Sequence, residues 1–195
     1  MIRTVRPRGN LILYDGTDHF HSDPNKTKKH KKLANSFLVA NGNNFENTAN
    51  ALDGDRINIG QSPNSTDRMH REVDKMVKNR GAKYDNVHII DHGNTVTDQD
   101  GNKLGVFPEF GDETIMGEDK VNDFIAMLKD SVGEDGTIYL HGCSQGKNAE
   151  LCQKIADETG ATVKSSSEPV AHIFQDETGP WANWDKCYEP SKDKD

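Results

Sequence analysis

The sequence predicts an α/β fold in which a mostly parallel central sheet of about six strands carries helices on both faces. Short apolar strands and amphipathic helices alternate along the chain, as is typical of strand–helix–strand units. The chain has 195 residues, which is enough for one substantial core. Its hydrophobic content of 32% is low, yet periodic patterns run through most of the sequence. We therefore expect residues 1–195 to form a single domain.

The first half of the chain contains three expected strands and two expected helices. The strands are short apolar stretches bounded by turn residues. The helices have apolar residues that recur at helical spacing, and cap residues flank the second one. We expect the strands at 10–16, 55–60 and 86–93, and the helices at 26–41 and 62–81.

The second half repeats this alternation after a hairpin. The hairpin is expected at 95–106, with Asp100-Gly101 as its turn. From about residue 175 the chain becomes a polar tail, in which Trp181 and Trp184 are the evident anchors. Helices are expected at 117–133 and 147–160, and strands at 137–142, 159–167 and 169–174.

Composition limits the partners and the compartment. The net charge of −8 argues against nucleic acid or an anionic membrane as the main partner. No apolar run is long enough to span a bilayer, and the basic N-terminus lacks the apolar region of a cleaved signal peptide. Three cysteines are too few for a disulfide framework. We therefore expect a cytoplasmic protein, or one exported without a cleaved signal peptide, that does not insert into membranes.

Two of the expected strands end in similar signatures. The strand at 86–93 ends in His92-Gly93, and the strand at 137–142 is followed by Cys143. In open parallel sheets, ligands and catalytic groups gather at the carboxyl ends of the strands. One hairpin and one helix separate the two strands, so we expect them to be neighbours, with the imidazole and the thiol at the same rim.

A thiol beside an imidazole suits nucleophilic catalysis. The His92 ring can accept the proton of Cys143, and the thiolate is the nucleophilic form. The backbone N–H groups of Gly93 and Cys143 are candidates for an oxyanion site. Asp91 precedes the histidine, but adjacent strand residues point to opposite faces, so we expect it to face the core or to cap a helix.

These residues resemble the caspase-like group of cysteine peptidases, which includes caspases, gingipains, clostripain, legumains, separases and the self-cleaving domains of large bacterial toxins. That group has an apolar strand ending in His-Gly and a later one ending in Ala/Gly-Cys. The matching residues here are 89–93 and 138–143. The separation of about 50 residues between histidine and cysteine is that of caspases. The narrow caspase signature Q-A-C-x-G is not met, since His141 and Gly142 precede the cysteine, so specificity for aspartate is not implied.

The resemblance implies a three-layer caspase-like sandwich and a cysteine endopeptidase that acts on a peptide or protein without a cofactor. Many members of the group cleave themselves, and some belong to toxins or effectors. The implied dyad is His92 and Cys143. His141 corresponds to a position that lines the pocket for the residue before the scissile bond. Asp15 and Asp18 follow the first strand, where the group also builds this pocket, and an acidic pair there favours Lys or Arg in the substrate.

Two other functions remain open. The same fold could serve as a non-catalytic binding module. The letters GCSQG also fit the serine-hydrolase elbow G-x-S-x-G, with Ser144 as nucleophile. An acid and then a histidine must follow that serine, and the candidates are Glu168 and His172. This triad is cramped and leaves the histidine of the first strand end unexplained, so we prefer the thiol as nucleophile.

The remaining titratable clusters carry no site. The segment DGTDHFHSD has suitable metal ligands, but its spacing matches no metal motif, so we expect a solvated loop and no metal. The basic run KTKKHKK is expected to be a solvated helix face. Cys152 lies on an apolar helix face and is expected in the core, and Cys187 has no assigned role.

Overall fold

The computed structural model describes residues 9–14, 49, 52–59, 65–110, 113–168, 171–176, 179–181 and 184–191. Its centre is a six-stranded sheet with the strand order β11-β8-β7-β3-β1-β2. All neighbouring strands are parallel except β11, which runs antiparallel to β8. The predicted α/β class with a mostly parallel central sheet is therefore confirmed. The strands are β1 (Asn10–Tyr14), β2 (Asp55–Asn58), β3 (Tyr84–Ile90), β7 (Val132–Leu140), β8 (Thr162–Ser165) and β11 (Lys186–Tyr188).

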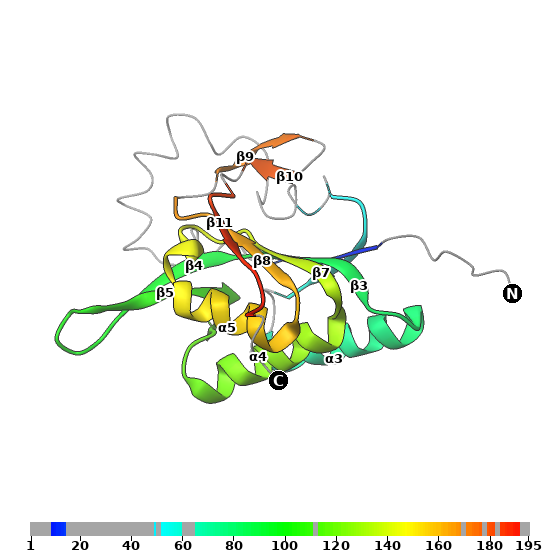
Figure 1. Ribbon diagram of the computed structural model, residues 1–195, viewed down its shortest axis with the longest axis horizontal. Helices are drawn as coiled ribbons and strands as arrows, with labels where there is room; N and C mark the ends of the chain where they lie inside the picture. Colours follow the sequence, from blue (N-terminus) through cyan, green and yellow to red (C-terminus); the bar gives the residue numbers. More distant parts are fainter. Residues whose placement is uncertain are drawn as a thin grey trace, which may run out of the picture.

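Three helices cover one face of this sheet (Figure 1): α3 (Ser65–Arg80), α4 (Glu118–Ser131) and α5 (Ala149–Thr159). Each connects two parallel strands, as the alternating pattern predicts. Gly81 ends α3 with a positive φ of 66°, and its N–H bonds to the Val77 carbonyl. The expected helix at 26–41, which would belong to the other face, lies outside the described residues. No helix in the described part of the chain is long and apolar enough to cross a membrane.

The predicted hairpin forms directly after β3. Its strands are β4 (His92–Thr97) and β5 (Lys103–Phe110), and the two-residue β6 (Glu113–Thr114) pairs with β5. The hairpin continues from the end of β3 and projects beyond the sheet (Figure 1). It is longer than expected, because His92 is already its first residue. The predicted histidine thus belongs to the hairpin and not to the central sheet.

The C-terminal region differs from the expectation. The stretch 169–174 was expected to add a strand to the central sheet. Instead β9 (Ala171–Asp176) pairs with β10 (Gly179–Trp181) in a separate two-stranded sheet. The sixth central strand is β11, from the region expected to be a polar tail, and its residues alternate in exposure as suits an edge strand. Three residues are too short for a periodicity signal, so pairing with β8 decides this strand.

The two faces of the sheet bury different clusters. Leu11, Val87, Ile89, Ile138 and Leu140 point toward the helices and join one large apolar core with them. The alternate residues of β1 and β3 face the other way. Among the described residues, this second face has a small apolar cluster, which consists of Ile12, Ala49, Leu52 and Ile90, with Tyr14 packed against it.

Candidate active site

The register of β3 and β7 brings the two predicted strand ends together. Residues 86–89 of β3 each pair with the β7 residue 51 positions later. The backbone N–H of His141 extends this ladder by bonding to the Ile89 carbonyl over 2.8 Å. Cys143 is 51 positions after His92, so the two residues follow the paired strand ends at matching positions. The predicted neighbourhood of these strands is confirmed.

A contact between backbones shows how closely the two segments approach. A Cβ atom added to Gly93 would collide with the carbonyl oxygen of Cys143 and come within 3.0 Å of its backbone nitrogen. Glycine is therefore required beside His92, because a side chain would push the cysteine segment away. His92 and Cys143 are both partly exposed. Neither residue is enclosed in the core, as a nucleophile and its proton acceptor require.

The turn after β7 has an unusual backbone at Ser144. Its φ of 59° and ψ of 17° are left-handed, and it is the one non-glycine residue with positive φ in the described ranges. The turn continues into a short 3₁₀ helix at Gln145–Lys147, and the Asn148 side chain then caps α5 by accepting from the Leu151 N–H. Cys143 therefore lies in the turn between β7 and the 3₁₀ helix, directly before a left-handed residue.

The loop after β8 supports the cysteine turn from its other side. The N–H of Ser144 donates to the Glu168 carbonyl over 3.1 Å, and the N–H of Gly146 donates to the Ser166 carbonyl over 2.9 Å. Ser166 and Gly146 are buried. The segments that follow three neighbouring strands, β3, β7 and β8, therefore meet at the turn that contains Cys143, which fits the general placement of ligand sites in parallel sheets.

Asp91 is the most buried acid beside the candidate dyad, with 1% of its surface exposed. Its Oδ2 accepts from the Gln145 Nε2 over 2.7 Å and from the Glu109 backbone N–H over 2.8 Å. The expectation that this aspartate faces inward is confirmed. Gln145 is 1% exposed as well. No motif predicts a role for this glutamine, since a polar residue two positions after a cysteine follows no recognisable pattern.

His141 is fully buried, which bears on its predicted contact with substrate. Its Nε2 lies 3.0 Å from the Nδ1 of His88, and Trp184 packs edge-on against its ring with centroids 4.9 Å apart. His88 in turn stacks on Tyr139, with centroids 4.6 Å apart. Burial lowers the pKa of His88 from its usual 6.5 to about 4. His141 is therefore not exposed to a substrate in this structure.

The three cysteines have different environments, and none of them forms a disulfide. Cys152 is fully buried on α5, as expected, and its thiol faces the Gln145 carbonyl at 3.7 Å. Burial raises the pKa of Cys152 to about 12. Cys187 is exposed on β11, and Cys143 is partly exposed. Cys152 is thus chemically inert in the folded protein.

The backbone geometry of Ser144 is the one feature that supports the alternative serine triad. Positive φ at Ser144 is typical of a strained turn serine. However, Glu168 meets this turn through its main-chain carbonyl, and its side chain is exposed. His172 is part of β9, where the structure describes the backbone alone. The structure therefore brings the serine and the predicted acid together only through the main chain.

Several predicted positions fall outside the described residues. These are Asp15 and Asp18, the segment DGTDHFHSD that contains them, and the basic run KTKKHKK. β1 ends at Tyr14, which pairs with Ile90 at the end of β3. The chain therefore leaves β1 next to the candidate dyad just before the two aspartates.

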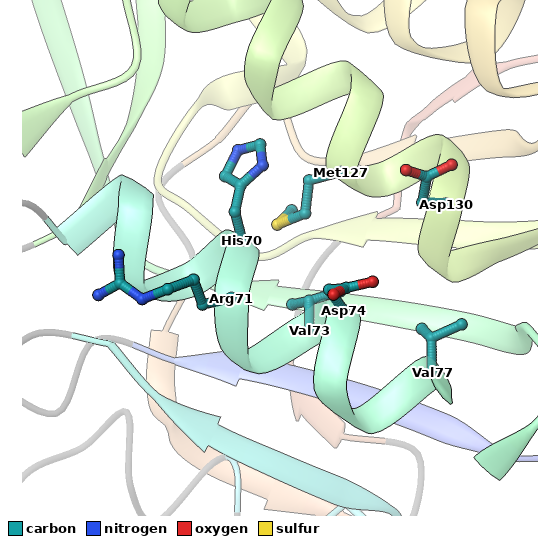
Figure 2. A pocket seen from close by; sticks show the side chains of 7 residues that line it. All are labelled: His70, Arg71, Val73, Asp74, Val77, Met127 and Asp130. Carbon is teal, nitrogen blue, oxygen red and sulfur yellow. The ribbon is translucent and has the colours of Figure 1, made fainter. Parts of the chain in front are cut away.

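A surface groove of about 460 Å³ lies elsewhere, between α3 and α4 (Figure 2). Val73, Val77 and Met127 supply its apolar lining. Figure 2 shows the side chains of His70 and Met127 extending toward each other from the two helices. The groove has no cysteine or serine in its lining and includes no strand-end residue. It therefore does not compete with the strand ends as the place of nucleophilic chemistry.

Comparison with known proteins adds no relative to this description: no family model, no curated protein and no solved structure matches the chain.

Proposed function

We propose that this protein is a cysteine endopeptidase in which Cys143 attacks the substrate and His92 transfers protons. The observation that carries the proposal is the matching position of the two residues after paired parallel strands, with the Gly93 and Cys143 backbones in contact. The partial exposure of both residues supports it further. A buried thiol such as Cys152 would not be available for this chemistry.

The reaction is acyl transfer. His92 accepts the thiol proton of Cys143, and the sulfur adds to the scissile carbonyl carbon. The carbonyl electron pair moves to the oxygen, which the N–H groups of Gly93 and Cys143 are proposed to stabilise. Collapse of this intermediate breaks the C–N bond, and His92 returns the proton to the leaving amine. Water, deprotonated by His92, then hydrolyses the thioester and regenerates the thiol.

The substrate is proposed to be a peptide or a protein segment, which includes a segment of this chain itself. Asp15 and Asp18 follow β1 in the sequence, and the strand order reverses at β1, with β2 on one side of it and β3, β7 and β8 on the other. Such switch points are the usual ligand sites of parallel sheets. The acidic pair supports a preference for Lys or Arg before the scissile bond. Since none of the three cysteines forms a disulfide, a reducing compartment such as the cytoplasm suits this enzyme.

Cleavage of a mixed peptide pool tests the proposal. Replacing Cys143 by alanine should abolish cleavage, and His92→Ala should reduce its rate by about a hundredfold or more, because the proton transfer is lost. Cys187→Ala is the matched control, since this cysteine is exposed on the edge strand β11 and has no proposed role. This variant should cleave as the parent does. Undiminished cleavage by the Cys143→Ala variant would refute the proposal.

Thiol labelling separates the enzyme from a binding module. Iodoacetamide at neutral pH should modify Cys143 faster than Cys187, although Cys143 is less exposed, because an adjacent imidazole stabilises the thiolate. Cys152 should react last. Equal rates at Cys143 and Cys187 would favour the non-catalytic module.

The left-handed backbone of Ser144 is the observation that keeps a serine hydrolase as second candidate. A fluorophosphonate probe decides between the two. Labelling that Ser144→Ala removes, together with hydrolysis that survives Cys143→Ala, would establish the serine enzyme.

A further inference from the structure

Asp91 and Gln145 connect the two halves of the candidate dyad. Asp91 directly precedes His92, and Gln145 comes two positions after Cys143. Their side chains share a hydrogen bond of 2.7 Å in a site where each residue is 1% exposed. The partner groups come from the end of β3 and from the turn after β7. This bond therefore joins the segment of the histidine to the segment of the cysteine.

The aspartate also fixes the hairpin that begins with the histidine. The same Oδ2 accepts from the Glu109 backbone N–H over 2.8 Å. Glu109 is the cross-strand partner of His92 in the β4–β5 pair. One carboxylate oxygen thus holds the β5 backbone opposite His92 and the turn after Cys143 at the same time. Breaking either hydrogen bond would leave a buried polar group without this partner, which is costly in a site that excludes water.

The glutamine packs tightly under the cysteine turn. A Cβ atom on Gly142 would collide with the Gln145 side-chain amide. The amide therefore fills the space beneath the residue that precedes Cys143, and the absence of a side chain at Gly142 makes this position possible. Cys152 adds a further contact, since its thiol faces the Gln145 carbonyl.

We propose that the Asp91–Gln145 hydrogen bond is a positioning device that sets the placement of Cys143 relative to His92. The inference rests on the proposed peptidase function. Beyond the hydrogen bond between His141 and Ile89, the two segments separate: the one after β3 forms the hairpin, and the one after β7 forms the cysteine turn. A buried polar link across this divergence, together with the Gly93 contact, keeps the two reacting groups at one distance. Neither Asp91 nor Gln145 acts on the substrate.

The pH dependence of Cys143 alkylation tests this role. We would measure the iodoacetamide rate at Cys143 by peptide mapping between about pH 5 and pH 9, which spans the ordinary thiol pKa of about 8.5. The proteins are the parent, His92→Ala, Gln145→Met and the control Gln153→Met. Methionine keeps the length of glutamine but removes the amide. Gln153 is a matched control, because its Nε2 bonds to Asp157 and to the Glu189 carbonyl away from the strand ends.

In the parent we expect the rate to rise well below pH 8.5, and His92→Ala should lose this early rise. Gln145→Met should also shift the rise toward the ordinary thiol value and slow peptide cleavage by about tenfold to a hundredfold, as a misplaced dyad would. Gln153→Met should match the parent in both. A purely structural glutamine would lower the melting temperature of Gln145→Met but leave the pH profile at Cys143 unchanged, and that result would overturn the inference.

An exchange of donor and acceptor covers the case in which Gln145→Met does not fold. Gln145→Glu places two carboxylates together and should disturb the profile. The double variant Asp91→Asn/Gln145→Glu should restore it in part, because the asparagine amide then donates to the glutamate, whereas the Glu109 N–H, which shares the Asp91 Oδ2 with Gln145 in the parent, loses its acceptor. A double variant no better than Gln145→Glu would count against the inference. If His92→Ala already shares the parent profile, the proposed function fails, and the positioning role fails with it.

Discussion

The two faces of the β3–β7 strand pair bury different kinds of side chain, although alternate residues of the same two strands form them. On the helical face, Val87, Ile89, Ile138 and Leu140 are fully buried and apolar. On the other face, the same strands bury hydrogen-bonded histidines among aromatic rings. The helical face is stabilised by apolar packing, which has no directional requirement. The second face is stabilised by hydrogen bonds and ring contacts, which require specific partners. The candidate dyad follows the ends of the same two strands.

The two faces are therefore expected to differ in how they respond to substitution and to pH. An apolar core loses stability in proportion to the volume removed, whatever the pH. A buried histidine pair instead makes stability depend on protonation, because a charged imidazole is poorly accommodated without water. Three substitutions test this contrast, and the expected effects decrease from the first to the third.

The largest effect is expected on the helical face. Phe124 on α4 is fully buried in the main core. Phe124→Ala should lower the free energy of unfolding by about 3–5 kcal/mol, because it removes apolar burial and leaves a cavity. Chemical denaturation measures this change, which should be the same at pH 5 and pH 7. Leu104→Ala, at a position 55% exposed on β5, is the control and should change stability by about 0.5 kcal/mol or less.

The second effect belongs to His88 and depends on pH. Its pKa is about 4 in the folded protein and about 6.5 when unfolded, so between these values the unfolded state binds more protons. The contribution of His88 to the free energy of unfolding is therefore fully present above about pH 6.5. It is lost as the pH falls toward 4, by about 3 kcal/mol in total. Denaturant unfolding at several pH values measures the loss.

His88→Phe isolates this contribution. A phenyl ring can keep the stacking on Tyr139 but cannot be protonated. The variant should lose about 1–3 kcal/mol at pH 7, since His141 loses its buried partner at this position. It should also show a weaker acid dependence than the parent. An identical pH slope in the two proteins would contradict the assignment.

The smallest effect is expected at Trp184, which covers the second face. Its ring packs edge-on against Tyr139 and His141, with centroids 5.3 Å and 4.9 Å away. Trp184→Ala should cost about 1–2 kcal/mol in the free energy of unfolding, and it should open His141 to acylation by diethyl pyrocarbonate. Trp184→Phe should retain most of the protection. If His141 reacts equally in all three proteins, the indole is not its cover.

The periodic spacing of apolar residues explains which parts of the fold could be predicted. Helix α3 and helix α4 follow from apolar residues at helical spacing, and β3 follows from a continuous apolar run. These signals are local, because each element repeats its pattern within its own residues. Strand β11 could not be found this way, since its three residues become a strand only through pairing with β8.

The candidate site divides in a similar way. His92 and Cys143 could be singled out because each follows an apolar strand and is bordered by glycine. Gln145 could not, because its role depends on Asp91, which lies 54 residues earlier in the chain. The burial of His141 was also missed. One of its ring contacts is with Trp184, a residue of the C-terminal region whose place in the fold has no local signal.

The sequence by itself determined the α/β class, most of the helices and strands, and the two polar residues at the strand ends. These properties depend on the spacing of apolar side chains and on turn residues, which are written within short stretches. Only the tertiary structure decided the offset of 51 residues between β3 and β7, the contact of Gly93 with Cys143 and the link from Asp91 to Gln145. Those features depend on which distant segments pair and in what register, and this choice is made by the free energy of the whole packed sheet.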